Sequence, residues 1–189
     1  MKKLFIKKMT FTVMFSAVIT ICSWISVPFS SGVSFSMQSF AVMIASYLLG
    51  AKMGLVSVVI YLSLGAVGVP VFAGCRGGFD VIFGASGGFL FGFLILALVV
   101  GVCRQYIGEG RIITVISMTI GVLLCYTLGT LWFYFVYADG SSFLSVAAAC
   151  ALPYMPFDAI KIWLALIVSH RLRDCKPLGG IYERKRKNT

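Results

Sequence analysis

Asp158 and Lys161 are the residues of this sequence best suited to bind a ligand. They place a carboxylate and an ammonium three residues apart in the otherwise apolar stretch LPYMPFDAIKIWLALIVSHRLRD, residues 152–174. On a helix, this spacing puts both side chains on one face. Charged side chains inside a membrane-spanning helix usually face the interior of a bundle or a cavity. The pair therefore predicts a binding site.

A simpler interpretation exists for each residue of this pair. Pro153 and Pro156 interrupt helical hydrogen bonding, so we expect the last helix to begin near Phe157, with Asp158 in its first turn. A carboxylate there caps free N–H groups, and Lys161 can extend its ammonium toward the membrane surface. We favour the binding site because the pair, the prolines and a glycine-rich loop share one membrane face.

The glycine-rich loop spans residues 70–80 and is expected on the outer face of the membrane. Glycine permits unusual backbone angles and close approach of the chain, so the loop looks suited to fold over a ligand. Its candidate site residues are Gly74, Arg76, Gly77, Gly78 and Asp80. The two charged residues either belong to the site or pair with each other on its rim, where an exposed ion pair contributes little.

These residues must be positioned by membrane-spanning helices. The chain has 189 residues, 60% of them hydrophobic and 12% charged, and its mean hydropathy of +1.00 is far above that of soluble domains. About 20 apolar residues are needed to cross the hydrocarbon. We expect an all-α membrane protein, a single domain of residues 1–189 with six transmembrane helices. The expected helices are 9–27, which ends before Pro28, 36–50, 53–69, 83–103, 112–136 and 157–172.

Positive charge gives the expected orientation, because Lys and Arg accumulate in cytoplasmic loops. If both termini are cytoplasmic, only Arg76 and Lys161 of the sixteen basic residues lie away from the cytoplasmic side. The net charge of +10 is then explained by topology and by attraction to anionic membrane lipid. Nucleic-acid binding is not needed to account for it.

Several other chemistries are disfavoured by the sequence. The six cysteines form no CxxC pair and no cluster with histidine, so no metal site or disulfide framework is indicated. There is no phosphate-binding G-x-x-x-x-G-K-[ST] motif, so any ATP hydrolysis must come from a partner. The repeat of Gly84, Gly88 and Gly92 is interpreted as a helix-packing stripe.

An intramembrane serine protease of the rhomboid type is a remote alternative. GASGG at residues 84–88 matches G-x-S-x-G, and His170 is the one histidine of the chain. Ser86 is expected at the outer end of its helix and His170 about 20 Å deeper. A nucleophile and its base must lie within about 3 Å of each other, so we expect no enzyme activity.

Three motifs resemble the BioY family, the biotin-binding S components of energy-coupling factor transporters. They are GLVSVVIYLSLGAVGVPVFAG, GASGGFLFGF and PYMPFDAIKIWLA. The resemblance covers the whole chain and implies a multi-pass cell-membrane receptor that captures biotin from outside and needs no cofactor. It also implies a transmembrane coupling subunit and two cytoplasmic ATPase subunits as partners.

By the same resemblance, Asp158 and Lys161 belong to the biotin site. A lysine can pair with the biotin carboxylate, and a carboxylate can accept the ureido N–H groups. The sequence does not decide which group each residue binds. An S component for a different vitamin remains the alternative. One departure from the family is the small-residue A-x-x-x-A seam expected in the first helix, where the coupling subunit docks. Ser16 and Thr20 keep its spacing, but Ala17 faces Ile21.

Overall fold

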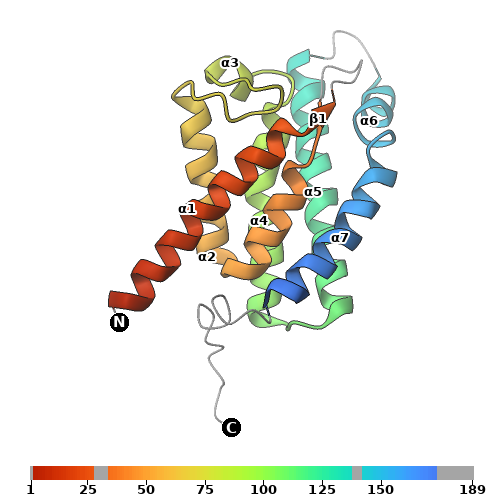
Figure 1. The fold of residues 1–189 in the computed structure, drawn as a ribbon. Coiled ribbons are helices and arrows are strands. Elements are labelled where there is room, and N and C mark those ends of the chain that lie inside the picture. The colour runs from red at the N-terminus through yellow and green to blue at the C-terminus, as the bar shows by residue number, and fades with distance from the viewer. Residues whose placement is uncertain (1, 28–33, 138–141, 174–189) are drawn as a thin grey trace.

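A computed structural model describes residues 2–27, 34–137 and 142–173. This part of the chain is built almost entirely of helices, and its only strands are two residues each (Figure 1). The prediction of an all-α membrane protein is therefore confirmed at the level of fold class. In chain order the elements are α1 (Lys2–Trp24), β1 (Ser26–Val27), β2 (Phe35–Ser36), α2 (Gln38–Ala66), α3 (Phe79–Ile82), α4 (Gly87–Tyr106), α5 (Arg111–Tyr137), α6 (Phe143–Ala151) and α7 (Met155–Arg173).

Among the described residues, four helices are long and apolar enough to cross a membrane, namely α1, α2, α4 and α5. Helices α6 and α7 pass the same test as a pair and are bent by 44° at the break between them. The break contains Pro153, which has no N–H to continue a helix. Residues 143–151, which lie outside the six helices expected from the sequence, form the separate helix α6.

Helix α2 folds back on itself at Gly50, whose φ of 78° and ψ of 177° are not helical. Glycine adopts a positive φ without steric cost. Gln38 Nε2 donates to the Tyr61 hydroxyl at 2.6 Å, although in a straight helix residues that far apart would be separated by about 35 Å. A Cβ on Gly54 would lie 2.8 Å from Ser46 Cα, so the two segments pack closely. The predicted turn between residues 50 and 53 is confirmed, and the two segments run side by side in Figure 1.

Helix boundaries differ from the prediction, most clearly in α1, α2 and α4. Helix α1 begins at Lys2 instead of residue 9 and ends at Trp24 instead of residue 27, since Ser26 and Val27 form strand β1. The second segment of α2 ends at Ala66 instead of residue 69, because Gly68 adopts a φ of 98° just before Pro70. Helix α4 begins at Gly87 instead of residue 83, since the glycine-rich residues before it form the short α3 and a turn.

The glycine stripe packs α4 against α5, as predicted for two of its three members. A Cβ on Gly92 would lie 2.6 Å from Cys125 Sγ, and one on Gly88 would lie 2.3 Å from Trp132 Cβ. Gly84 precedes α4, and its carbonyl oxygen accepts a hydrogen bond from Trp132 Nε1 at 3.0 Å. The close contact of α4 with α5 holds two walls of the site described below.

The first residues of α1 and the last residues of α7 lie at the same end of the bundle (Figure 1). The strand pair, the 70–80 loop, α3 and α6 lie at the opposite end. We call these the inner and outer ends. The candidate site residue Arg76 lies in the 70–80 loop of this outer end, and Asp158 lies in the first turn of α7, directly after α6.

Candidate functional site

A cavity lies at the outer end of the bundle, between the beginnings of α2, α4 and α7, the outer half of α5 and the 70–80 loop. The space between its lining residues, part of it open to solvent, is about 790 Å³. Most of the large side chains that line it are apolar or aromatic: Phe35, Phe72, Phe89, Leu90, Phe93 and Tyr154. A few polar groups converge on the same space: Gln38, Ser39, Arg76, Tyr126, Asp158 and Lys161. This lining suits an organic ligand with an apolar body and polar ends.

Asp158 and Lys161 lie on one face of α7, as their spacing predicted. Lys161 Nζ lies 2.8 Å from Asp158 Oδ1. The two residues are only 6% and 4% exposed, and both line the cavity. The interpretation of Lys161 as a side chain that reaches for the membrane surface is therefore wrong. The ammonium points into the bundle and is neutralised there by the carboxylate.

The Lys161 ammonium is surrounded by groups from the beginning of α2. It donates to the Ser36 carbonyl oxygen at 2.7 Å and to Ser39 Oγ at 3.3 Å. The Phe35 ring lies beneath it, with its centroid 4.0 Å from Nζ, a favourable cation–π arrangement. Removing a charge from water costs several kcal/mol unless such partners replace the hydration. These contacts explain how a lysine is retained at this depth.

Asp158 is held from a second side by α5. The Tyr126 hydroxyl donates a hydrogen bond to Asp158 Oδ2, while Oδ1 faces Lys161. Asp158 lies in the first turn of α7, and its backbone N–H donates to the Tyr154 carbonyl oxygen at 2.9 Å. The carboxylate therefore has a fixed orientation at the cavity wall, with acceptor capacity left on both oxygens.

Arg76 is the second cation of the cavity, at its mouth. It is exposed and lines the cavity, and its Nε lies 3.5 Å from the Ala73 carbonyl oxygen. Within the described residues, Arg76 and Asp80 do not form the ion pair considered above. Asp80 is exposed on α3 and is not among the lining residues.

The three glycines of the loop shape its backbone and do not line the cavity. Gly74 has a φ of 73° and Gly78 a φ of 110°, values that other residues rarely adopt. A Cβ on Gly77 would lie 2.3 Å from the Val69 carbonyl oxygen. These glycines allow the loop to turn back over the bundle and present Arg76 at the mouth.

The first half of the loop is anchored to α1 and α2. The Phe72 ring packs edge-on against Tyr61, with centroids 5.5 Å apart, and occupies the space that a side chain on Gly65 would need. Trp24 Nε1 donates to the Pro70 carbonyl oxygen at 2.9 Å, and Ser23 Oγ donates to the Val71 carbonyl oxygen. The loop thus forms a wall of the cavity.

Several cavity residues were not identified from the sequence. Tyr126 and Phe35 contact the charged pair directly, and Gln38 is a buried amide at the cavity wall whose Nε2 donates to Tyr61. Gln38 carried a usable signal, because it is a polar amide at the start of an apolar span. Tyr126 carried none, since a tyrosine in an apolar helix is an ordinary core residue.

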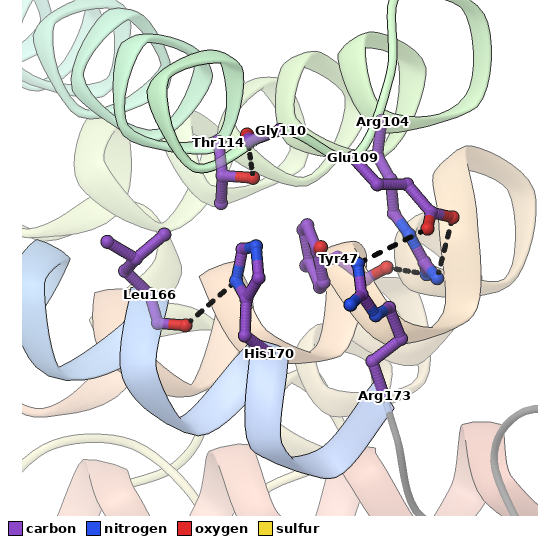
Figure 2. Close-up of polar contacts among 8 residues, drawn as sticks. All are labelled: Tyr47, Arg104, Glu109, Gly110, Thr114, Leu166, His170 and Arg173. Carbon is purple, nitrogen blue, oxygen red and sulfur yellow. Dashed lines mark hydrogen bonds and ion pairs between the residues drawn. The ribbon is translucent and has the colours of Figure 1, made fainter.

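A second polar cluster lies at the inner end of α7 (Figure 2). Glu109 forms ion pairs with Arg104 and Arg173, both at 3.4 Å. Arg104 donates to the Tyr47 carbonyl oxygen and lies 4.6 Å from the centroid of that ring. The His170 ring stacks against the Tyr47 ring, with the two ring centroids 5.4 Å apart. None of these residues lines the cavity.

The protease alternative is incompatible with this arrangement. Ser86 is the N-cap of α4 and lines the cavity at the outer end. His170 stacks on Tyr47, which contacts Arg104 in the last turn of the same helix. The length of α4 between Ser86 and Arg104 is about 27 Å at helical rise. Ser86 and His170 therefore cannot act as nucleophile and base.

Comparisons with known proteins agree with one another. The model of the BioY family matches residues 1–177. A biotin transporter BioY of Thermotoga maritima is 36% identical over 84% of this chain and 91% of its own length. A probable biotin transporter BioY of Pyrococcus horikoshii is 33% identical over 88% and 96%. The crystal structure of an S-component for biotin from an ECF-type ABC transporter superposes with a TM-score of 0.89 at 25% identity, covering 97% of this chain and 99% of that one.

Proposed function

The chain belongs to the BioY family, and from this premise we propose that it binds biotin in the outer cavity and serves biotin uptake. Like its relatives, it is a transport component and not an enzyme. The observation that carries the proposal is the buried Asp158–Lys161 pair at the wall of a largely apolar cavity. Biotin combines an apolar bicyclic body with a polar ureido group and a carboxylate, which matches such a lining.

The proposed site residues are Asp158, Lys161 and Arg76, joined by Tyr126 and Gln38. Gly74, Gly77, Gly78 and Asp80 act through the shape of the loop and not by contact with biotin. No cofactor is part of the proposal.

The proposed topology has six crossings of the cell membrane, with both termini in the cytoplasm and the cavity open to the outside. The two segments of α2 count as separate crossings, and α6 with α7 counts as one. The first residues of α1 and the last residues of α7 lie at the same end of the bundle (Figure 1), which supports an even number of crossings. Labelling of the exposed Cys75 by an impermeant thiol reagent in intact cells tests this orientation. Protection of Cys75, with outside labelling of a thiol introduced at residue 187, would reverse it.

The proposed partners are a transmembrane coupling subunit and two cytoplasmic ATPase subunits. The structural neighbour comes from an ECF-type ABC transporter, which supports this assembly. Capture of biotin itself needs no nucleotide, because the chain carries no phosphate-binding motif. Membrane lipid is a further proposed partner, which surrounds the apolar sides of the bundle and contacts its basic inner end.

A binding measurement with the purified chain tests the function. We expect one biotin per chain, bound without ATP and without partner subunits, as measured by calorimetry in detergent. Thiamine and riboflavin serve as competitors and should not displace biotin. Tight binding of another vitamin by folded protein that ignores biotin would favour the alternative S component and overturn the assignment.

A further inference from the structure

A chain of buried hydrogen bonds connects the end of α1 to the wall of the cavity. Ser23 lies in α1, whereas Tyr61 and Gln38 lie in the two segments of α2. We infer that Ser23 and Tyr61 are positioning residues, which orient the Gln38 amide so that its carbonyl oxygen is presented to the ligand. Their role rests on the proposed function, because neither residue lines the cavity itself.

The chain of hydrogen bonds begins at two backbone carbonyl oxygens, which can only accept. Ser23 Oγ donates to the Val71 carbonyl oxygen and lies 2.7 Å from the Thr20 carbonyl oxygen. A serine hydroxyl has one proton, so in either case that proton is used toward a carbonyl. In any further hydrogen bond, Ser23 Oγ can therefore take part only as an acceptor.

Tyr61 must then donate to Ser23. The Tyr61 hydroxyl forms side-chain hydrogen bonds with Ser23 and with Gln38, whose Nε2 lies 2.6 Å away. The phenol has one proton, and Ser23 has none left to give. If Tyr61 donated to Gln38 instead, the Ser23 and Tyr61 oxygens would face each other without a proton between them. Every contact is satisfied when Tyr61 donates to Ser23 and accepts from Gln38.

The orientation of the Gln38 amide follows from this order. The nitrogen of a side-chain amide donates and its oxygen accepts, so the Tyr61 oxygen, whose proton is used, requires the nitrogen. With Nε2 turned toward Tyr61, the carbonyl oxygen Oε1 points away from Tyr61. Gln38 is 5% exposed and lines the cavity. A hydrogen-bond acceptor is thereby offered at a fixed position to a donor group of the ligand.

Burial keeps this order of donors and acceptors in place. Ser23 and Tyr61 are fully buried, and the Phe72 ring packs edge-on against Tyr61 with centroids 5.5 Å apart. A buried donor or acceptor that loses its partner is costly, so the direction of one hydrogen bond cannot change without the others. The amide is thus oriented before the ligand arrives, which lowers the cost of binding.

A double-mutant cycle on biotin affinity tests this role. Gln38→Met removes the amide at similar side-chain length and should weaken biotin about 10-fold. Tyr61→Phe frees the amide to rotate and should weaken biotin about fivefold. In the Gln38→Met background, Tyr61→Phe should cost less than about twofold, because no amide is left to orient. Calorimetry in detergent measures the affinities, and thermal denaturation reports whether each variant is folded.

Two controls are matched in chemistry and lie away from the cavity. Tyr47→Phe removes a buried hydroxyl that has no hydrogen-bond partner among the described residues. Ser57→Ala removes a buried hydroxyl that donates to a backbone carbonyl of its own helix at 2.7 Å. Both should leave biotin affinity within about twofold. Ser23→Ala should match Tyr61→Phe and likewise lose its effect in the Gln38→Met background.

The double variant distinguishes positioning from packing. A loss of about 50-fold, the product of the two single effects, would show that Tyr61 acts independently of Gln38 and would overturn the inference while biotin binding stands. Unchanged affinity in Gln38→Met or in Tyr61→Phe would overturn it as well. If Tyr61→Phe fails to fold, the cycle of Ser23→Ala with Gln38→Met decides by the same criterion. Wild-type protein that does not bind biotin contradicts the proposed function itself.

Discussion

The two ends of α7 both carry charged side chains, yet their surroundings differ. At the outer end, Asp158 and Lys161 are almost fully buried and line a cavity. At the inner end, the Arg173 and Glu109 side chains are 32% and 36% exposed and lie among groups that tie α7 to the loop before α5 (Figure 2). Burial of charge is costly and is retained where it serves a purpose. The comparison supports the proposal that the outer pair binds the ligand, whereas the inner cluster ties α7 to its neighbours.

The largest effect is expected when the outer carboxylate loses its charge. Asp158→Asn leaves the Lys161 ammonium buried without its counter-ion and weakens the acceptor for biotin. Biotin affinity should fall about 30- to several-thousand-fold, equivalent to about 2–5 kcal/mol. Calorimetry on the purified variant measures this loss. Glu109→Gln is the matched change at the inner end, and equal losses of affinity in both variants would contradict the division of roles.

The next effect concerns stability at the inner end. Arg104→Leu removes the donor to the Tyr47 carbonyl oxygen and the packing on that ring. The free energy of unfolding should fall by about 2–3 kcal/mol, because a buried acceptor loses a charged donor. Thermal denaturation in detergent measures the change. Biotin affinity of the folded variant should stay within about twofold, and a tenfold loss would show that the inner cluster communicates with the cavity.

Removing one tyrosine hydroxyl at each end of the bundle gives a third test of the comparison. Tyr126→Phe removes the hydrogen bond to Asp158 and should weaken biotin about 10-fold. The Tyr47 hydroxyl is buried and finds no hydrogen-bond partner among the described residues, so Tyr47→Phe should leave binding unchanged and keep or raise thermal stability. Binding and melting measurements on both variants provide the test. If Tyr47→Phe lost biotin affinity and Tyr126→Phe did not, the proposed location of the biotin site at the outer end would be contradicted.

The smallest effect is expected for the two ion pairs of Glu109, whose own side chain is partly exposed although its partner Arg104 is buried. Both pairs are 3.4 Å long and involve a carboxylate that is about one-third exposed. Glu109→Gln should lower stability by about 1 kcal/mol or less. The difference from wild type should shrink as salt is added, since exposed pairs are screened. A loss above about 2 kcal/mol that persists in high salt would show that the cluster is a buried network.

Much of the fold followed from local sequence. Apolar runs of membrane-spanning length predicted the positions of α4, α5 and α7, and the turn at Gly50 was expected from the break in LGAKMG. Errors arose where glycine or proline permits more than one local structure. The residues before α4 form α3 and a turn, and Pro153 separates α6 from α7 instead of merely preceding the last span. Local propensity does not decide between such alternatives.

The site was predictable in part. The spacing of Asp158 and Lys161 placed them on one face of one helix, because neighbours at i, i+3 are fixed by helical geometry. Arg76 was expected near them from the position of its loop, and it lies in the cavity lining. Asp80 and the three glycines were expected in the same role, but the backbone geometry that they create directs them away from the cavity.

The sequence by itself predicted a membrane protein, the approximate positions of its long helices, and a carboxylate and an ammonium on one face of α7. Only the tertiary structure decided that this face closes a cavity. Tyr126 reaches Asp158 from α5 across 32 positions of sequence, and the Ser36 carbonyl oxygen reaches Lys161 across 125. Helical periodicity is a local property of the chain, whereas such contacts depend on how separate helices pack. Burial of the pair at the cavity wall arises from that packing.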